Sequence, residues 1–199
     1  RYMCMYHEYT TAGGATPTQE MVESYEDKDG NKVDWSAWHT ADGTTKYPPY
    51  ESLEPRFAAT ILYNGASWKD VELECCVDGT YGTYVDYGVE PYPYGKTVTG
   101  YYMRKFLSEG LSDVDLGGEK HWVFLRLGEV YLNVAEAYAH QQNWDKAYDY
   151  LNKIRRRAQV PTRATGNNLT LFIDLLAKER MVELAFEGHR YWDLRRWAM

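Results

Sequence analysis

Residues 124–161 read FLRLGEVYLNVAEAYAHQQNWDKAYDYLNKIRRRAQVP, and this segment decides the fold class. In its first half, apolar residues recur at the spacing of one helix face, which predicts a helix over about residues 122–140. The residues of this expected apolar stripe are Leu127, Tyr131, Val134 and Tyr138. A helical framework is therefore expected in this part of the chain.

A second helix is expected directly after the first. Asn143 has a side chain well suited to cap its start, and Pro161 marks its end. The apolar face of this helix consists of Ala147, Tyr148, Leu151, Ile154 and Ala158. Because the connection between the two helices is short, they are predicted to form an antiparallel αα-hairpin.

This hairpin follows the pattern of a tetratricopeptide repeat, with Phe in place of the leading Trp and a few extra residues between the helices. The matching positions are Phe124, Leu127, Gly128, Tyr131, Ala147, Leu151 and Pro161. Gly128 is expected to permit a close helix approach. A single stacked-repeat unit cannot bury its hydrophobic face alone, so we expect neighbouring repeats outside this chain.

A third helix is expected over about residues 170–186, before Gly188 interrupts the pattern. Acidic and basic side chains alternate densely from here onward. They are Glu179, Arg180, Glu183, Glu187, Arg190, Asp193 and Arg195. Two carboxylates on one helix are compatible with an acid and base pair. An adjacent Arg holds a carboxylate ionised, however, so this pattern favours a structural ion-pair network.

The composition divides the chain into two parts. Residues 1–118 contain 19 acidic and 9 basic residues and 14 of the 19 tyrosines, whereas residues 119–199 contain 10 acidic and 13 basic residues. We expect a loop-rich aromatic lobe with short strands over 1–118 and a helical, tetratricopeptide-like part over 119–199. The predicted fold class is mainly α, and α+β in detail.

Short strands are expected within the lobe. The β-prone run over residues 58–63 ends at Asn64-Gly65, and alternation resumes over residues 68–77, which predicts a hairpin with its turn near Asn64-Gly65. Another strand is expected over residues 99–106. The segment between them, 78–96, is rich in Gly, Tyr and Pro and is expected to be a long aromatic loop.

Several functional classes find no support in the sequence. A net charge of -7 argues against nucleic acid, and the run Arg155-Arg156-Arg157 suits a helix C-terminus or pairing with the acidic lobe. No nucleophile and base constellation, phosphate loop or dinucleotide fingerprint is present, so we expect no enzyme activity and no cofactor.

Cysteine usage and hydropathy exclude further classes. Cys4, Cys75 and Cys76 are odd in number, and the vicinal pair cannot form an unstrained disulfide, so buried free thiols are expected. The five histidines are scattered singly, which argues against zinc. No run approaches the ~20 apolar residues that span a bilayer, and residues 1–10 lack the pattern of a signal peptide.

Several segments, read in order, resemble the SusD/RagB family of outer-membrane nutrient-binding lipoproteins. They are TPTQEMV at 16–22, EPRF at 54–57 with ATI at 59–61 and NG at 64–65, TGYY at 99–102 with RKF at 104–106, FLRLGEVYL at 124–132 with AEA at 135–137, and ERMVELAFEGHRYWDLRRW at 179–197. Together they cover most of the chain, so the resemblance is specific.

The resemblance implies a tetratricopeptide-containing helical framework with an irregular lobe, lipid-anchored at the cell surface on an outer membrane of the Bacteroidetes type. It further implies a non-catalytic protein that delivers glycan oligosaccharides to a SusC-like TonB-dependent transporter in polysaccharide utilisation. The chain starts at Arg1 without an initiator Met and ends within a helical pattern. We therefore expect one truncated SusD-like domain, with the lipidated N-terminus outside this chain and no anchor at Cys4.

A sugar offers an apolar C–H face and a rim of hydroxyls, so it binds to flat aromatic side chains with polar tips. Aromatic residues gather in two predicted loops, where binding residues tend to lie. The candidate ligand-binding residues are Trp35, Trp38, Tyr47, Tyr50, Tyr81, Tyr84 and Tyr87, with Tyr92 and Tyr94 further along the second loop. The alternative is that these rings pin long loops to the scaffold. Trp68, Trp192 and Trp197 are expected to be packing residues.

Further alternatives remain open. The acidic turn Asp27, Asp29, Asn31 and Asp34 offers oxygen ligands for calcium, but it lacks the complete motif and the closing Glu, which favours a solvated turn. The ligand of a RagB-type member is a peptide, and an acidic lobe would favour a basic one. The tetratricopeptide-like repeat would also suit a scaffold that binds a partner protein. A glycosidase would need two carboxylates at a defined separation in a cleft.

Overall fold

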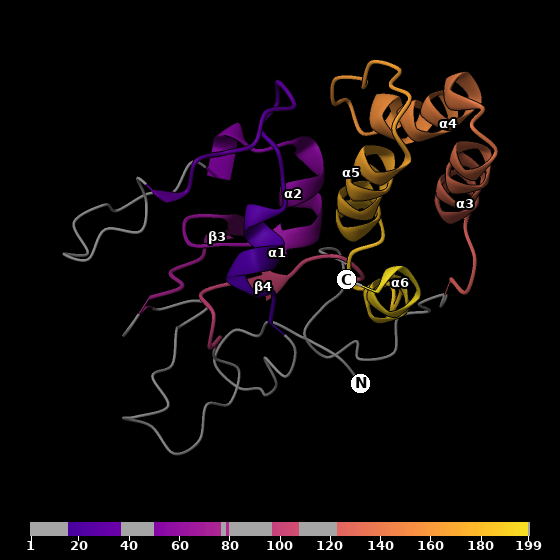
Figure 1. Ribbon diagram of the computed structural model, residues 1–199. Helices are drawn as coiled ribbons and strands as arrows, with labels where there is room; N and C mark the ends of the chain where they lie inside the picture. Colours follow the sequence, from indigo (N-terminus) through magenta and orange to yellow (C-terminus); the bar gives the residue numbers. More distant parts are fainter. Residues whose placement is uncertain (1–15, 37–49, 77–78, 80–96, 108–122, 199) are drawn as a thin grey trace. The chain divides into compact units, whose positions relative to one another are not determined.

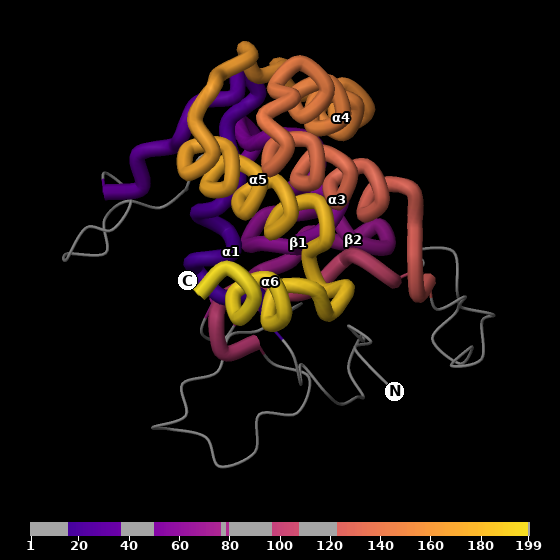
Figure 2. The backbone as a smooth tube through the Cα atoms, turned by 45° about the vertical axis from the view of Figure 1, so that its right-hand side comes forward, coloured from indigo at the N-terminus to yellow at the C-terminus, as the bar shows by residue number. Residues whose placement is uncertain are grey.

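The computed structural model describes residues 16–36, 50–76, 79, 97–107 and 123–198 (Figures 1 and 2). The contacts between residues divide the chain into two compact units. The first unit consists of residues 1–22 and 58–121, and the second consists of residues 23–57 and 122–199. Among the described residues, no helix is both long and apolar enough to cross a membrane.

The second unit contains the predicted helices. They are α3 (Leu127–His140), α4 (Trp144–Arg157), α5 (Leu169–Glu183) and α6 (Arg190–Trp197) (Figure 1). Helix α3 packs most extensively against α4 and also against α5, while α6 contacts α5. The predicted hairpin is therefore confirmed, and the helix expected over 170–186 begins and ends slightly earlier in the chain.

Local hydrogen bonds fix the turn between α3 and α4. The N–H of Gln142 donates to the carbonyl oxygen of Ala139 at 2.9 Å, and the N–H of Asn143 donates to that of Tyr138 at 2.9 Å. Gln142 has a φ of 58°, so α3 ends in a left-handed cap of the Schellman type. The Asn143 side chain then accepts from the N–H of Lys146, which confirms the predicted N-cap of α4.

The core of the second unit lies between α3, α4 and α5. It contains Leu132, Ala135, Ala139, Ala147, Tyr148, Leu151, Ile154, Phe172, Leu176 and Leu184. The face predicted for α4 is buried as expected, including Ala158. Asn168 caps α5 by accepting from the N–H of Leu171 at 3.0 Å. The side chains of Asn143 and Asn168 therefore fix the first residues of α4 and α5.

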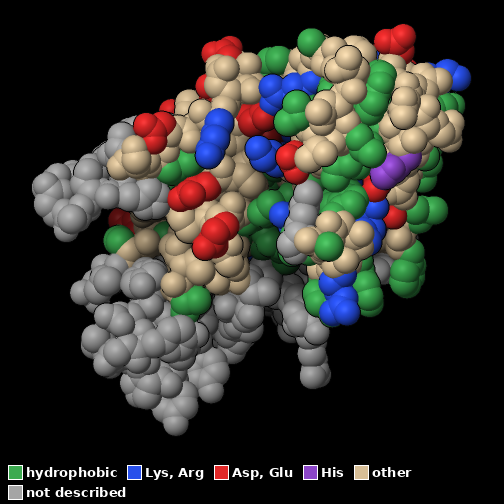
Figure 3. All heavy atoms as spheres, in the orientation of Figure 1, with side chains coloured by type: hydrophobic (Ala, Val, Ile, Leu, Met, Phe, Trp, Pro, Cys, Tyr) green, Lys and Arg blue, Asp and Glu red, His purple; other side chains and the backbone are tan. Residues whose placement is uncertain are grey.

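The apolar stripe predicted for α3 is not its core face, and this prediction was wrong. Leu127 is 61% exposed, whereas the fully buried residues are Leu132, Ala135 and Ala139. Hydrophobic side chains are visible at the surface over α3 in Figure 3. The small Ala side chains allow α3 to approach α4 closely. The larger Tyr131 and Tyr138 lie at the flank, where their rings pack on Tyr150 at 5.6 and 5.8 Å.

Residues 23–57 belong to the second unit by their contacts, although their composition placed them in the lobe over 1–118. They contain isolated bridges that join Glu26 to Lys32 and Asp27 to Leu53, followed by a 3-10 helix, η2 (Tyr50–Ser52). Charged side chains of this segment pair with α4 and α5, as described below. Such pairing joins residues more than 120 positions apart and leaves no local signal in the sequence.

The described elements of the first unit are short. Helix α1 (Gln19–Glu23) begins in the first unit. Within α2 (Pro55–Thr60) the chain passes from the second unit back to the first. Strand β1 (Ile61–Leu62) pairs antiparallel with β4 (Tyr102–Met103), and β2 (Ser67–Trp68) pairs antiparallel with β3 (Val71–Glu72). A small core joins these strands and consists of Leu62, Ala66, Trp68, Leu73, Cys75 and Tyr102.

The hairpin expected around Asn64-Gly65 was wrong. Most of the run 58–63 is helical or pairs with β4, and the hairpin turns at Lys69-Asp70 instead. Both turn residues are left-handed, with φ of 49° and 66°. This geometry matches a two-residue type I′ turn, which follows the twist of the flanking strands. The strand expected over 99–106 is reduced to β4.

Candidate functional site

Two of the seven candidate aromatic residues, Trp35 and Tyr50, lie in the described part of the chain. Trp35 is only 6% exposed, and its ring lies 6.3 Å from that of Tyr50. Tyr50 in turn stacks on Phe57 at 5.7 Å, with an angle of 10° between the ring planes. The structure thus brings Trp35 and Tyr50 together as a tilted pair, with 48° between the ring planes, and Tyr50 of this pair stacks on Phe57.

The other candidates lie outside the described residues. They are Trp38, Tyr47, Tyr81, Tyr84 and Tyr87, together with Tyr92 and Tyr94. Their assignment as ligand-binding residues stays a prediction. Of the Trp residues expected to pack, Trp68 is buried and Trp197 lies against the core of the second unit, whereas Trp192 is exposed beside Tyr191.

The acidic turn considered for calcium is held together by Asp27. Its Oδ1 accepts from the N–H groups of Asp29 and Asn31 at 2.9 and 2.8 Å, and the Asn31 N–H is the main cause that lowers the pKa of Asp27. Asp34 accepts from Ser36. Within the described ranges, no group of three or more acidic, His or Cys residues could hold a metal ion. Asp27 therefore has a turn-forming role, in line with the solvated turn that the sequence favours over calcium binding.

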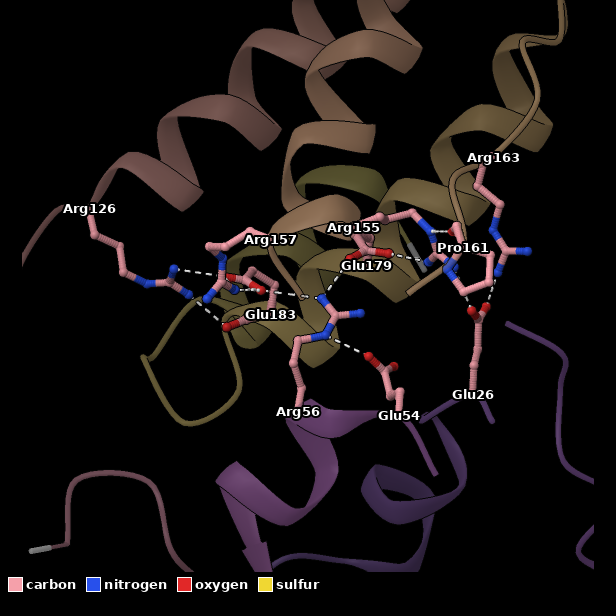
Figure 4. A network of polar contacts seen from close by, with 10 residues as sticks. All are labelled: Glu26, Glu54, Arg56, Arg126, Arg155, Arg157, Pro161, Arg163, Glu179 and Glu183. Atoms are coloured by element: carbon pink, nitrogen blue, oxygen red, sulfur yellow. Dashed lines mark hydrogen bonds and ion pairs between the residues drawn. The ribbon is translucent and has the colours of Figure 1, made fainter. Parts of the chain in front are cut away.

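A buried network of Arg and Glu side chains dominates the polar interior of the second unit (Figure 4). Glu179 of α5 accepts from Arg56 at 2.6 Å and from Arg155 of α4 at 2.7 Å. Arg155 also donates to Glu26 at 2.8 Å and to the carbonyl oxygen of Pro161 at 2.6 Å. The carboxylate of Glu179 is thereby fixed between two guanidinium groups from different segments.

Glu183, one helical turn after Glu179, is the second centre of this network. It accepts from Arg126 at 2.7 Å, from Arg157 at 2.6 Å and from Arg56 at 3.2 Å. Burial acts to raise the pKa of Glu183, but the hydrogen bond from Arg126 and the charges of the surrounding arginines outweigh it and lower the pKa. Glu183 is therefore held as a carboxylate.

The start of α3 packs closely against the ion pair of Arg126 and Glu183. A Cβ atom added at Gly128 would lie 2.4 Å from Nη1 of Arg126 and 3.2 Å from a carboxylate oxygen of Glu183. Gly128 does permit a close approach, as expected, but the neighbour is an ion pair rather than a helix backbone.

A second set of ion pairs joins α5, α6 and α3. Arg180 donates to Asp193 at 2.7 Å and to Asn133 at 2.6 Å. Glu136 accepts from Arg196 and from the indole N–H of Trp197. These contacts confirm that the charge pattern of residues 179–196 is a structural ion-pair network, because each carboxylate faces an arginine.

This arrangement does not suit acid catalysis. A general acid needs a protonated, accessible carboxyl group, whereas Glu183 and Glu136 have lowered pKa values beside arginines. Glu54 is an exception, since burial raises its pKa despite the neighbouring Arg56. Glu54 is only 2% exposed, however, so a substrate cannot reach it.

An open cavity of about 750 Å³ lies at the surface of the second unit, and no sequence pattern predicts it. It lies between the α3–α4 turn and the segment that joins α4 to α5, and Trp144 contributes to its wall. In the sequence, one of its walls is the amide run Gln141-Gln142-Asn143, directly before this Trp.

Comparisons with known proteins identify the relatives of this chain. A model of the SusD family matches residues 1–199, the whole chain. The chain belongs to the SusD family. Its SusD-like relatives include protein P25 of Formosa agariphila, which is 36% identical over 80 residues, or 39% of this chain and 15% of the relative. The resemblance found in the sequence motifs is thereby confirmed.

Two solved SusD-like structures from Bacteroides fragilis share the fold. One has a TM-score of 0.75 and 29% identity and covers 94% of this chain and 37% of its own chain. The other, described as a SusD-like carbohydrate-binding protein, has a TM-score of 0.72 and 28% identity and covers 92% of this chain and 35% of its own. The predicted SusD-like fold class is confirmed. This chain spans little more than a third of the length of either structure.

Proposed function

We propose that this protein binds glycan oligosaccharides at the cell surface and delivers them, uncleaved, to a SusC-like TonB-dependent transporter. The observation that carries this proposal is the SusD-family match over the whole chain, together with the likeness to a structure described as a SusD-like carbohydrate-binding protein. We propose that the protein acts at the outer membrane through an N-terminal lipid anchor.

The proposed sugar contacts are the aromatic candidates around Trp38 and in the 78–96 segment. Trp35 and Tyr50 flank Trp38 and Tyr47 in the sequence, and the contact between the rings of Trp35 and Tyr50 supports an aromatic region here. We propose that the C–H faces of a sugar pack on the rings of these candidates.

The absence of catalysis is part of the proposal. Hydrolysis of a glycosidic bond needs a carboxyl group with a raised pKa that reaches the leaving oxygen, and a second carboxylate nearby. In the described part of the chain, the buried carboxylates of the second unit are paired with arginines, as Glu179 and Glu183 illustrate. These groups serve stability instead.

The test is a binding screen of the intact protein against plant, host and microbial polysaccharides, with peptides as a second panel. The variant Trp38→Ala is expected to weaken binding of the preferred glycan about tenfold, which corresponds to ~1.4 kcal/mol, with no change in melting temperature. Trp35→Ala serves as the contrasting variant. Removal of a buried Trp costs about 3–5 kcal/mol, so it should lower the melting temperature.

Three other outcomes of the screen are informative. Binding of peptides, and of no glycan, would replace the ligand with a peptide and favour the RagB-type alternative. Basic peptides would then bind best because of the acidic lobe. Binding of neither class would leave a protein scaffold as the function. If Trp38→Ala binds the glycan with unchanged affinity, Trp38 is not a sugar contact, but the proposal that the ligand is a glycan is unaffected.

A further inference from the structure

The cavity at the end of the α3–α4 hairpin is wide open to solvent, and its lining side chains are exposed apart from the half-buried Trp144. Its volume of about 750 Å³ belongs to an open surface groove rather than to an enclosed pocket. It is lined by residues 141–145 from the α3–α4 turn and the start of α4, and by residues 165–167 from the α4–α5 segment. Both walls belong to the second unit.

The first wall is fixed by the cap at the end of α3. Gln142 is left-handed, with a φ of 58°, at a position where Gly is the usual residue. An amide side chain is therefore present here although a Gly would suit the backbone better. Because the N–H groups of Gln142 and Asn143 are both bonded to α3 carbonyl oxygens, the wall is held in one conformation.

The second wall is fixed by side chains at both ends of the α4–α5 segment. Asn152 of α4 donates to the carbonyl oxygen of Arg163 at 2.9 Å and accepts from its N–H at 2.8 Å. Asn168 caps α5 at the other end. Between them, a Cβ atom at Gly166 would lie 2.9 Å from the hydroxyl of the buried Tyr148, so Gly allows the segment to lie against α4.

The chemistry of the lining points to a neutral, polyhydroxylated ligand. The described residues that line the cavity offer amides, one carboxylate and one hydroxyl, and none of them is Lys or Arg. An anion would therefore find no countercharge. A wholly apolar ligand would leave these polar groups without partners. Amides and carboxylates suit pairs of adjacent hydroxyls, which both donate and accept.

Trp144 adds the aromatic surface that such a ligand needs. Its ring lies 6.5 Å from that of the buried Phe172 at 60°, so one side is supported by the core while the residue also lines the cavity. An indole combines an apolar face with an N–H donor. We infer that this cavity is a sugar-binding subsite, in which Trp144 contacts the C–H face of one ring and Gln142 binds its hydroxyls.

This inference rests on the proposed function, since it assigns a further site for the same class of ligand. The test uses fluorine NMR of the intact protein labelled with 5-fluorotryptophan. The Trp144 signal is assigned by its loss in Trp144→Phe. Titration with the glycan preferred in the screen is expected to shift this signal in a saturable manner, while the signal of Trp68, buried in the first unit, stays in place.

A matched pair of variants tests the role of the amide. Gln142 and Gln159 are both exposed and left-handed, with φ of 58° and 59°, and only Gln142 lines the cavity. Gly is well tolerated at such positions, so both proteins should fold. Loss of one hydrogen bond in Gln142→Gly is expected to weaken the affinity read from the Trp144 signal roughly threefold to tenfold. Gln159→Gly should leave it unchanged.

The outcomes separate this inference from the proposed function. A glycan that binds the protein without moving the Trp144 signal overturns the subsite and leaves the function intact. Equal affinities in Gln142→Gly and Gln159→Gly also overturn the assigned contact. If no glycan binds the unmodified protein by any measure, the proposed function and the subsite both fail.

Discussion

Arg155 and Arg156 are neighbours in the sequence, yet they lie in opposite environments. Arg155 is 1% exposed and pairs with Glu179 and Glu26, whereas the Arg156 side chain is 55% exposed and meets the exposed Asp149 at 3.2 Å. An ion pair in water contributes little, because screening and side-chain entropy offset the attraction. Removal of one partner from a buried pair leaves the other charge uncompensated.

We therefore expect Arg155→Ala to lower the free energy of unfolding by about 3–5 kcal/mol and Arg156→Ala by less than ~1 kcal/mol. Urea denaturation of the intact protein measures both values. Because the two substitutions remove the same side chain from adjacent positions of α4, each is a control for the other. Similar losses in the two variants would contradict the buried network.

At the level of single residues, the sequence predicted the features that depend on near neighbours. The cap Asn143 is an example, since its partner Lys146 is three positions away. Leu127 shows where prediction from near neighbours fails. Its spacing placed it on an apolar stripe, but the face that α3 buries is selected by how closely α4 can approach, and Ala135 and Ala139 allow the closest approach.

At the level of elements, helices were easier to predict than strands. The four helices of the second unit have 8 to 15 residues each, so local patterns extend over several turns, most clearly in α4. Each strand has two residues, and β1 pairs with β4 some forty positions later. The hairpin was misplaced because Asn64-Gly65 has the preferred composition for a tight turn, whereas the actual turn consists of Lys69 and Asp70.

The position of this turn gives a prediction of increased stability. Asp70 has a φ of 66°, which Gly adopts without strain, so Asp70→Gly should raise the free energy of unfolding by about 1 kcal/mol. Asn64→Gly is the control and should be neutral or destabilising, because Asn64 is not left-handed. Thermal or urea denaturation measures both. A loss of stability in Asp70→Gly would contradict the turn at Lys69-Asp70.

At the level of the whole molecule, the carboxylates predict how stability responds to acid. Glu183 and Glu136 have pKa values below their ordinary value of 4.5, because arginines favour their charged forms despite burial. The unfolded chain then binds protons more readily than the folded one. Their stabilising contribution is complete above about pH 4.5 and is lost as the pH falls through the folded pKa values. Glu54, whose pKa is raised, acts in the opposite direction.

We expect the free energy of unfolding to fall steadily as the pH decreases below about 4.5, and the slope to be shallower in Glu183→Gln, which has no proton to gain at that position. Urea denaturation at a series of pH values measures the slope. An identical slope in the two proteins would show that Glu183 does not have the lowered pKa that its arginine neighbours impose.

The family of this chain could be predicted from sequence because its motifs are spread along most of the length, and each is a local pattern. The binding site could not be predicted to the same degree. Trp35 and Trp38 are similar in the sequence, but only the structure shows that Trp35 is buried against Tyr50. The cavity beside Trp144 is formed by two segments about twenty positions apart, and no periodic pattern marks such a meeting.

The central claim is that the protein binds a glycan and releases it unchanged, and titration calorimetry of the intact protein tests both parts at once. Binding without turnover predicts heats that diminish to the dilution value as the preferred glycan saturates the site. A thermal power that persists after each injection would show hydrolysis and contradict the non-catalytic assignment. Heats equal to dilution for every glycan would contradict binding itself.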